Sequence, residues 1–113
     1  AVYKNILVME YFPAYLLHED PPQRPREFYE KLIKEMKKVL DAGLVHTDLS
    51  EFNVLNYNEE PILIDFSQAV DLRYPNVQRF LRRDVRNVVR YFSARGLALD
   101  EDQEFEKLWT RKA

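Results

Sequence analysis

The hydrophobic positions of this 113-residue chain follow a helical period in two long stretches. The first stretch begins at Pro25 and ends before Gly43, and its apolar residues recur every three or four positions: Phe28, Leu32, Met36, Val39 and Leu40. Proline suits the first turn of a helix and glycine the position after its last turn, so we expect a helix between them. The second stretch predicts a helix from about Asn76 to Ser93, stopped near Gly96.

The segments around these helices predict short strands and loops. Ile6–Met9 is typical of a buried strand, and the proline-rich stretch 13–25 has no period and predicts a loop. Two apolar runs, Val54-Leu55 and Ile62–Ile64, flank a polar turn at Asn58–Pro61. Such a pair of runs predicts a β-hairpin.

A third, shorter helix should follow Asp100, a good N-cap residue. We expect its apolar side chains to face inward: Phe105, Leu108 and Trp109. The predicted fold class is therefore α+β, mainly helical, with one small β-hairpin. We expect residues 1–113 to form a single domain, because this length is too short for a two-lobed enzyme. A domain rarely begins in a core strand such as Ile6–Met9, so we expect the chain to be part of a longer protein.

Composition narrows the class of function. Hydrophobic residues make up 46% of the chain and charged residues 32%, which is typical of a globular domain. The net charge of −2 gives no bulk affinity for nucleic acid. The absence of cysteine excludes disulfides, thiolate metal sites and thiol nucleophiles, and it suits a reducing compartment. No apolar run approaches the roughly 20 residues of a membrane span. We therefore expect a cytoplasmic protein without a membrane partner.

The second predicted helix has two faces of different character. At about 100° per residue, one face is apolar and the other carries arginines: Arg79, Arg82, Arg83, Arg86 and Arg90. Asp84 falls on the apolar face, where a carboxylate needs strong partners such as the backbone N–H groups of a tight loop. The arginine face has two open interpretations. It is either a solvated helix face or an RNA-phosphate contact surface formed by Arg79, Arg83, Arg86 and Arg90.

The residues that carry candidate chemistry are Asp48, Asn53 and Asp65. Asp48 and Asn53 lie five positions apart in a polar loop, and Asp65 follows the second strand of the predicted hairpin. A hairpin returns its second strand beside the first, so Asp65 should approach Asn53. Carboxylate and amide oxygens suit Mg²⁺. Asp48 could orient a hydroxyl group, which is the division of roles that phosphoryl transfer needs.

Three segments resemble protein kinase motifs. His46-Thr47-Asp48 followed by Asn53 resembles the catalytic loop H-R-D with its later Asn, and Ile64–Ser67 resembles the D-F-G segment with Ser67 in place of Gly. Leu7–Tyr11 resembles the hinge strand against which adenine packs. The longer strings HTDLSEFNVL and IDFSQAVDLRYPNVQRFLRRDVRNV closely resemble the C-terminal lobe of RIO family atypical serine/threonine protein kinases, particularly the archaeal members. The resemblance extends from about Ile6 to Phe92.

This resemblance implies ATP-dependent phosphoryl transfer or ATP hydrolysis in the maturation of the small ribosomal subunit. Asp48 is similar to the catalytic aspartate, and Asn53 and Asp65 to the ligands of Mg²⁺ or Mn²⁺ that also contact ATP. The hinge that meets adenine corresponds to Met9, Glu10 and Tyr11. Three further residues would support the site: His46, Ser50 and Asp84. We expect the Asp84 side chain to accept hydrogen bonds from backbone N–H groups near His46 and Thr47. The implied partners are ATP, an N-terminal kinase lobe, and the precursor of the small ribosomal subunit with its rRNA and proteins.

Two departures from ordinary kinases qualify this implication. Ser50 stands where many serine/threonine kinases carry a lysine, although RIO kinases share the serine. The chain also has no G-x-G-x-x-G loop and no V-A-I-K-type lysine, which belong to an N-terminal lobe, so we expect the chain alone to be poorly active. Two alternatives remain open: a small-molecule phosphotransferase of the aminoglycoside type, and a non-catalytic lobe that binds RNA or protein.

Overall fold

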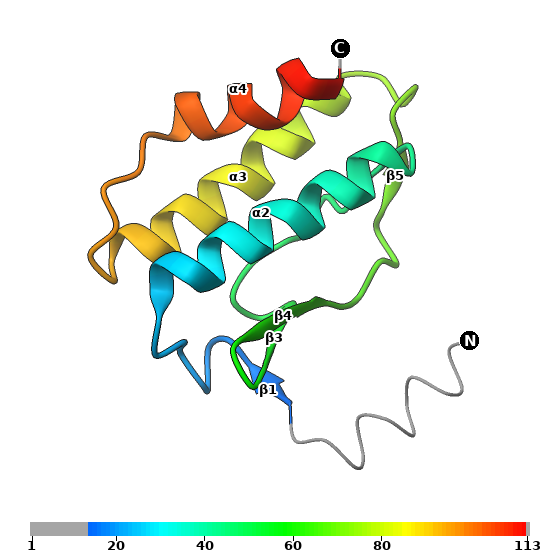
Figure 1. Ribbon diagram of the computed structural model, residues 1–113. Coiled ribbons are helices and arrows are strands. Elements are labelled where there is room, and N and C mark those ends of the chain that lie inside the picture. Colours follow the sequence, from blue (N-terminus) through cyan, green and yellow to red (C-terminus); the bar gives the residue numbers. More distant parts are fainter. Residues whose placement is uncertain (1–13, 113) are drawn as a thin grey trace.

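The computed structural model describes residues 14–112, and the fold is α+β as predicted (Figure 1). In residues 14–112 three helices lie side by side, and short antiparallel strands lie along one edge of them. The elements in chain order are β1 (Tyr15–Leu16), α2 (Pro25–Asp41), β2 (Leu44–Val45), β3 (Val54–Tyr57), β4 (Glu60–Leu63), β5 (Val70–Asp71), α3 (Val77–Ser93) and α4 (Glu101–Lys112). The expected strand Ile6–Met9 lies outside the described residues. None of the helices between residues 14 and 112 has the length and apolar character needed to cross a bilayer.

The helix boundaries agree with the sequence signals. Helix α2 begins at Pro25, and Gly43, two residues after its end, has a φ of +89°. Helix α3 follows Asn76, whose φ of 60° is left-handed and suits asparagine better than most residues. The carboxylate of Asp100 accepts a hydrogen bond of 3.1 Å from the backbone N–H of Gln103, so Asp100 caps α4 as predicted.

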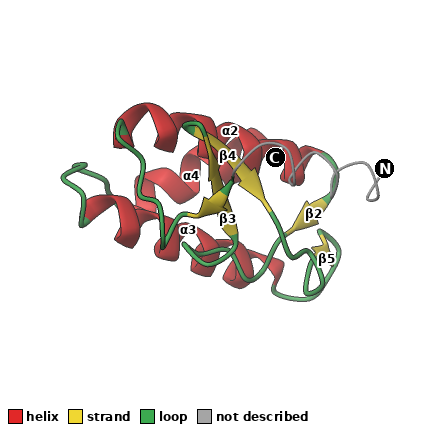
Figure 2. Ribbon diagram, turned by 90° about the horizontal axis from the view of Figure 1, so that it is seen from below, coloured by secondary structure: helices red, strands yellow, loops and turns green. Residues whose placement is uncertain are grey.

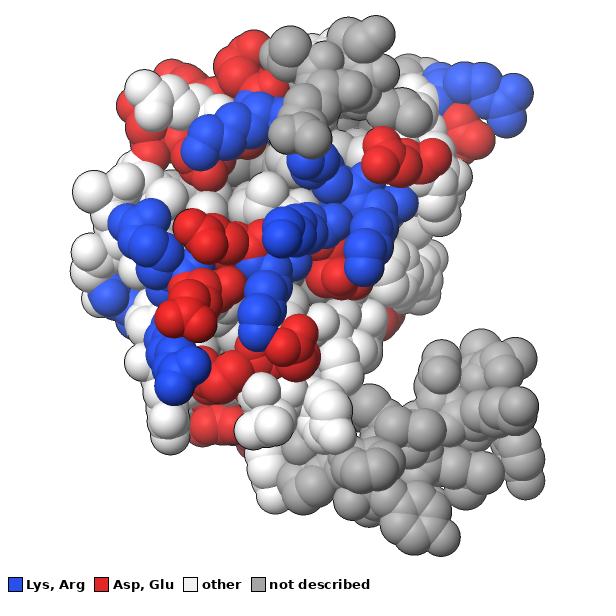
Figure 3. Space-filling model, in the orientation of Figure 1, with Lys and Arg blue, Asp and Glu red and all other residues white. Residues whose placement is uncertain are grey.

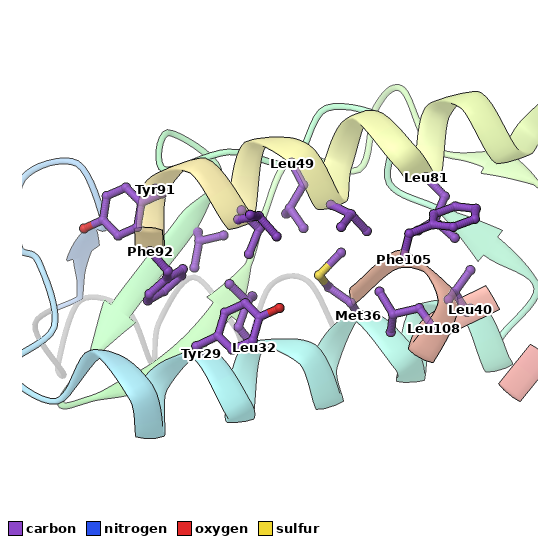
Figure 4. Close-up of a cluster of buried hydrophobic side chains, with 14 of the residues drawn as sticks. Tyr29, Leu32, Met36, Leu40, Leu49, Leu81, Tyr91, Phe92, Phe105 and Leu108 are labelled. Atoms are coloured by element: carbon purple, nitrogen blue, oxygen red, sulfur yellow. The ribbon is translucent and has the colours of Figure 1, made fainter. Parts of the chain in front are cut away.

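The hydrophobic core lies between α2, α3 and α4 (Figure 4). Phe92 of α3 is fully buried and contacts two rings of α2, with centroid distances of 6.0 Å to Phe28 and 5.3 Å to Tyr29. Burying one such aromatic side chain stabilises the fold by about 1.5–3 kcal/mol. Helix α4 adds the buried Phe105 as expected, whereas Trp109 is only half-buried and packs against the Phe105 ring at 6.2 Å.

The predicted hairpin consists of β3 and β4, paired from Val54 opposite Leu63 to Tyr57 opposite Glu60. Its turn is shorter than the predicted four residues. Only Asn58 and Glu59 connect the strands, and their φ values of 50° and 69° are those of the two-residue turn that matches the twist of a hairpin. The structure therefore places Glu60 in strand β4 and not in the turn.

The loop prediction for residues 13–25 is wrong at Tyr15 and Leu16. These two residues form β1, which pairs antiparallel with β3, and the backbone N–H of Leu17 continues the contact with a 2.8 Å bond to the carbonyl of Val54. A strand of two residues has no period to detect in the sequence. It exists because β3 offers an unpaired edge on the side opposite β4.

The second correction concerns segment 44–53, which was predicted as a polar loop around Asp48 and Asn53. Leu44 and Val45 form β2, which pairs with β5 at Asp71 and Val70, apart from the β3–β4 hairpin (Figure 2). Several side chains of the segment are buried: Val45, His46, Thr47 and Leu49. The polar groups tolerate burial because each finds a hydrogen-bond partner, as the site shows.

Candidate active site

Asp48 lies in the loop between β2 and β3, with its side chain exposed between buried neighbours. Thr47 and Leu49 are 5% and 1% exposed, so the loop directs only the Asp48 carboxylate outward. Thr47 has a φ of 75°, a left-handed conformation that is rare for a β-branched residue. Backbone strain of this kind persists only where surrounding contacts impose it. The hydroxyl of Thr47 supplies one such contact, a 2.7 Å bond to the carbonyl of Gln68.

The side chain of Asp84 supplies two more contacts that hold this loop. It is 1% exposed and accepts hydrogen bonds from the backbone N–H groups of Thr47 at 2.9 Å and Leu49 at 3.0 Å. The inward orientation predicted from the helical period is confirmed, and the donors are Thr47 and Leu49, whereas the expectation was His46 and Thr47. Burial raises the pKa of Asp84 to about 6, although the two N–H bonds act to lower it.

Two neighbours of Asp84 on α3 also hold the loop, and sequence reasoning missed both. Arg83 donates to the carbonyl of Thr47 at 2.8 Å, and Asn87 donates through its amide to the carbonyl of Leu49 at 3.1 Å. Asn87 follows Asp84 by three positions, so a shared helix face was the available signal. Arg83 had been placed with the exposed arginines. The three side chains together bond the N–H groups and carbonyls of Thr47 and Leu49.

His46 connects this loop to the end of strand β4. Its Nδ1 accepts a hydrogen bond from the backbone N–H of Asp48 at 3.1 Å, so its Nε2–H donates to the carbonyl of Ile64 at 2.7 Å. These two bonds define the neutral tautomer. The imidazole ring also lies 4.7 Å from the exposed ring of Phe66. His46 therefore fixes the distance between the segments that carry Asp48 and Asp65.

Asn53 joins the three candidate residues into one site. Its amide nitrogen donates to the backbone carbonyl of Asp48 at 2.6 Å and lies 3.5 Å from the Asp48 carboxylate. The carbonyl of Asn53 accepts from the backbone N–H of Ile64 at 3.0 Å, which places the next residue, Asp65, beside it. Asp65 is exposed with a left-handed φ of 62°, and it accepts a 2.7 Å bond from the Ser67 hydroxyl. The segment that carries Asp65 therefore lies beside Asn53, and a metal site shared by the two side chains stays a prediction.

The donor set at this point fits Mg²⁺. Asn53 uses its amide nitrogen as a donor, so its carbonyl oxygen remains as a hard ligand, and Asp65 adds an exposed carboxylate. Within residues 14–112, no group of three or more His, Cys, Asp or Glu side chains could hold a metal. An ion bound here would therefore take its remaining ligands from phosphate and water, which is how Mg²⁺ is usually coordinated in nucleotide sites.

Ser50 shapes the turn and has no described contact with Asp48. Its hydroxyl accepts from the backbone N–H of Phe52 at 3.2 Å, and its carbonyl accepts from the N–H of Asn53 at 2.9 Å. The predicted hinge residues Met9, Glu10 and Tyr11 lie outside the described residues, so that part of the site stays a prediction.

The sequence matches the model of the RIO domain family over residues 1–105. This chain belongs to the RIO family. It is 40% identical over 111 residues to the RIO-type serine/threonine-protein kinase Rio1 of Haloferax volcanii, covering 94% of this chain and 38% of that protein. It is 43% identical over 96 residues to Rio1 of Methanocaldococcus jannaschii, covering 79% of this chain and 33% of that one. The RIO chain thus spans about a third of the length of these relatives.

A solved structure is similar to this RIO chain in fold as well as in sequence. The Rio2 kinase of Chaetomium thermophilum, solved as an ADP/Mg²⁺-phosphoaspartate complex, superimposes with a TM-score of 0.65 at 25% identity. The match covers 85% of this chain and 34% of that one. It confirms the predicted kinase-like α+β fold.

Proposed function

We propose that this RIO chain supplies the catalytic and metal-binding half of an ATP-dependent phosphoryl-transfer site. The observation that carries the proposal is the placement of three residues: Asn53 bonds the Asp48 carbonyl, and Ile64, which bonds both Asn53 and His46, sets the neighbouring Asp65 beside them. The full-length protein would act as a serine/threonine protein kinase, an ATPase or both, in maturation of the small ribosomal subunit. The ADP and Mg²⁺ of the Rio2 complex support ATP and Mg²⁺ as the ligands here, with Mn²⁺ as a second metal of similar ligand preference.

The residues divide the reaction between them. The exposed Asp48 carboxylate orients the attacking hydroxyl group or water and accepts its proton. A bond forms between the attacking oxygen and the γ-phosphorus. The bond from that phosphorus to the β–γ bridging oxygen breaks, and its electron pair leaves with ADP. Asn53 and Asp65 would hold Mg²⁺, which neutralises the negative charge of the phosphates. His46 and Asp84 keep the loop in the geometry that aligns these groups.

The remaining contacts of ATP would come from segments that the structure does not describe. Met9, Glu10 and Tyr11 would meet adenine through backbone groups, and an N-terminal lobe would cover the phosphates. Because relatives are about three times longer, the proposal concerns the full-length protein, and the isolated chain would bind ATP weakly.

The experiment compares two substitutions in the full-length protein. Asp65→Asn removes the one carboxylate charge among the two proposed metal ligands and should lower ATP turnover by orders of magnitude with the fold intact. Asp48→Ala should keep Mg-ATP affinity within a few-fold and still lose turnover, because Asp48 orients the attacking group and does not hold phosphate. Turnover is measured as ADP release, and affinity by titration calorimetry.

Asp71→Asn is the matched control, because Asp71 is an exposed aspartate on β5 that bonds Arg73 outside the site. Near-normal turnover in Asp65→Asn, or equal losses of affinity and turnover in Asp48→Ala, would contradict the assigned roles. A wild-type protein without turnover would favour the alternative of a non-catalytic RNA- or protein-binding lobe. Intact mass after a single turnover would separate hydrolysis from transfer to an aspartate, which the phosphoaspartate of the Rio2 complex makes a reasonable acceptor.

A further inference from the structure

An open cavity of about 560 Å³ lies along the first half of α3 and the segment before it. Its walls are basic and aromatic: Tyr74, Phe80, Arg79, Arg82, Arg83 and Arg86. Tyr74 is half exposed, and its ring meets the Phe80 ring edge-on at 5.9 Å. The reaction steps proposed above use none of these side chains directly. We refer to this cavity as the α3 groove.

The arginines of the α3 groove differ in what they bind. Helix α4 neutralises two of them, because Glu101 pairs with Arg86 at 3.3 Å and Arg82 pairs with both Glu101 and Asp102. The side chain of Arg79 is exposed and makes no hydrogen bond or ion pair within residues 14–112, which leaves its charge for a ligand.

Arg83 uses only part of its guanidinium on the catalytic loop. One nitrogen donates to the Thr47 carbonyl, and the group lies 5.3 Å from the centre of the Phe80 ring. A guanidinium has five N–H donors, so Arg83 has donors left over. The unneutralised charge of the α3 groove is therefore concentrated at Arg79 and Arg83, one helical turn apart.

The α3 groove continues to the catalytic carboxylate. The residues that line a neighbouring cavity of about 470 Å³ include Asp48 and Thr47 together with Tyr74, Phe80 and Arg83. The last three residues line both cavities. Whatever occupies the α3 groove therefore lies next to the group that would orient the phosphate acceptor.

We propose that the α3 groove binds the phosphate acceptor, a peptide segment with Asp or Glu residues close to its acceptor serine. This inference rests on the proposed kinase function and names its substrate class. The carboxylates pair with Arg79 and Arg83, and the serine hydroxyl reaches Asp48. Residues four apart on a helix are about 6 Å apart, and an extended peptide advances about 3.3 Å per residue. The two acidic residues that pair with Arg79 and Arg83 are therefore expected about two positions apart, next to the serine that reaches Asp48.

The pairing pattern favours an acidic peptide over RNA. A surface that follows an RNA backbone needs a row of unpaired cations at successive phosphates. Here the carboxylates of α4 interrupt the arginine row at Arg82 and Arg86. Acidic and basic side chains also lie next to one another across the molecular face drawn in Figure 3. Two neighbouring arginines without a carboxylate partner among the described residues, in a groove that leads to Asp48, suit a short acidic segment better than a polyanion.

The test measures binding of fluorescent serine peptides to the full-length protein without ATP. One peptide carries Asp two to four positions before the serine, a second carries Asp after it, and a third carries Asn at all these positions. We expect one acidic peptide to bind about three- to tenfold more tightly than the Asn peptide at low salt. Arg79→Gln should remove that preference and leave peptide-independent ATP turnover unchanged.

Arg90→Gln is the matched control, because Arg90 is exposed on the same face of α3 about three turns beyond Arg79. It should leave peptide binding unchanged. Equal affinity for acidic and Asn peptides overturns the inference even if the protein hydrolyses ATP. If the acidic peptide binds in an Arg79-dependent way but the protein has no ATP turnover, the peptide-binding role of the α3 groove stands and the proposed kinase function is refuted instead. If single-stranded RNA binds and both Arg79→Gln and Arg90→Gln weaken it equally, the arginine face is an RNA surface and the peptide inference is wrong.

Discussion

Replacing Asp84 by asparagine tests how the catalytic loop is held. The wild-type carboxylate accepts from two buried N–H groups, Thr47 at 2.9 Å and Leu49 at 3.0 Å. Asparagine keeps one acceptor oxygen and turns an NH₂ group toward the other N–H. One buried donor then loses its partner, which costs about 1–3 kcal/mol. Alanine removes both acceptors, so Asp84→Ala should cost about 2–6 kcal/mol.

The assay is urea unfolding of the full-length protein combined with hydrogen exchange at single amides. In Asp84→Asn, hydrogen exchange should accelerate at the amide that faces the new NH₂ group, either Thr47 or Leu49. In Asp84→Ala, exchange should accelerate at both amides. Asp102→Asn serves as the control, because Asp102 is an exposed carboxylate that pairs with Arg82 and should change stability by less than about 1 kcal/mol. If Asp84→Asn left both stability and amide protection at the wild-type level, the anchoring role of Asp84 would be refuted.

Three further outcomes follow from the structure. The raised pKa of Asp84, about 6, means that the folded state binds more protons than the unfolded state between about pH 4 and pH 6. The contribution of this group to the free energy of unfolding should therefore fall as pH rises through that window. Denaturation at pH 4.5 and pH 7.5 should show this fall in the wild type and not in Asp84→Asn. Tyr29→Phe removes the hydroxyl that donates 2.5 Å to the buried Glu104, and calorimetry should show a loss of about 1–3 kcal/mol, whereas Tyr15→Phe, at an exposed ring, should change little. Asn53→Asp keeps an oxygen ligand but loses the donor to the Asp48 carbonyl, so ATP turnover should fall while urea stability changes by less than about 1 kcal/mol; an equal loss of both would contradict a role in the site.

Much of the local structure is encoded in the sequence itself. A helix that buries one stripe must repeat its apolar residues near every 3.6 positions, and α2 and α3 do so over 17 residues each. The same period placed Asp84 on the buried face. Asp48, Asn53 and Asp65 were identifiable because their roles require those side chains at that spacing along one short stretch.

The tertiary structure decided what depends on contacts between distant segments. Strands β1, β2 and β5 have two residues each, too few for a period, and form only because a partner strand lies beside them. The second donor to Asp84 is Leu49, and the sequence does not specify which loop amides a helix will meet. The arginine face shows the same limit. Periodicity places the arginines together, but only the packing of α4 against α3 determines that its carboxylates neutralise Arg82 and Arg86, while Arg79 has no ion pair in residues 14–112.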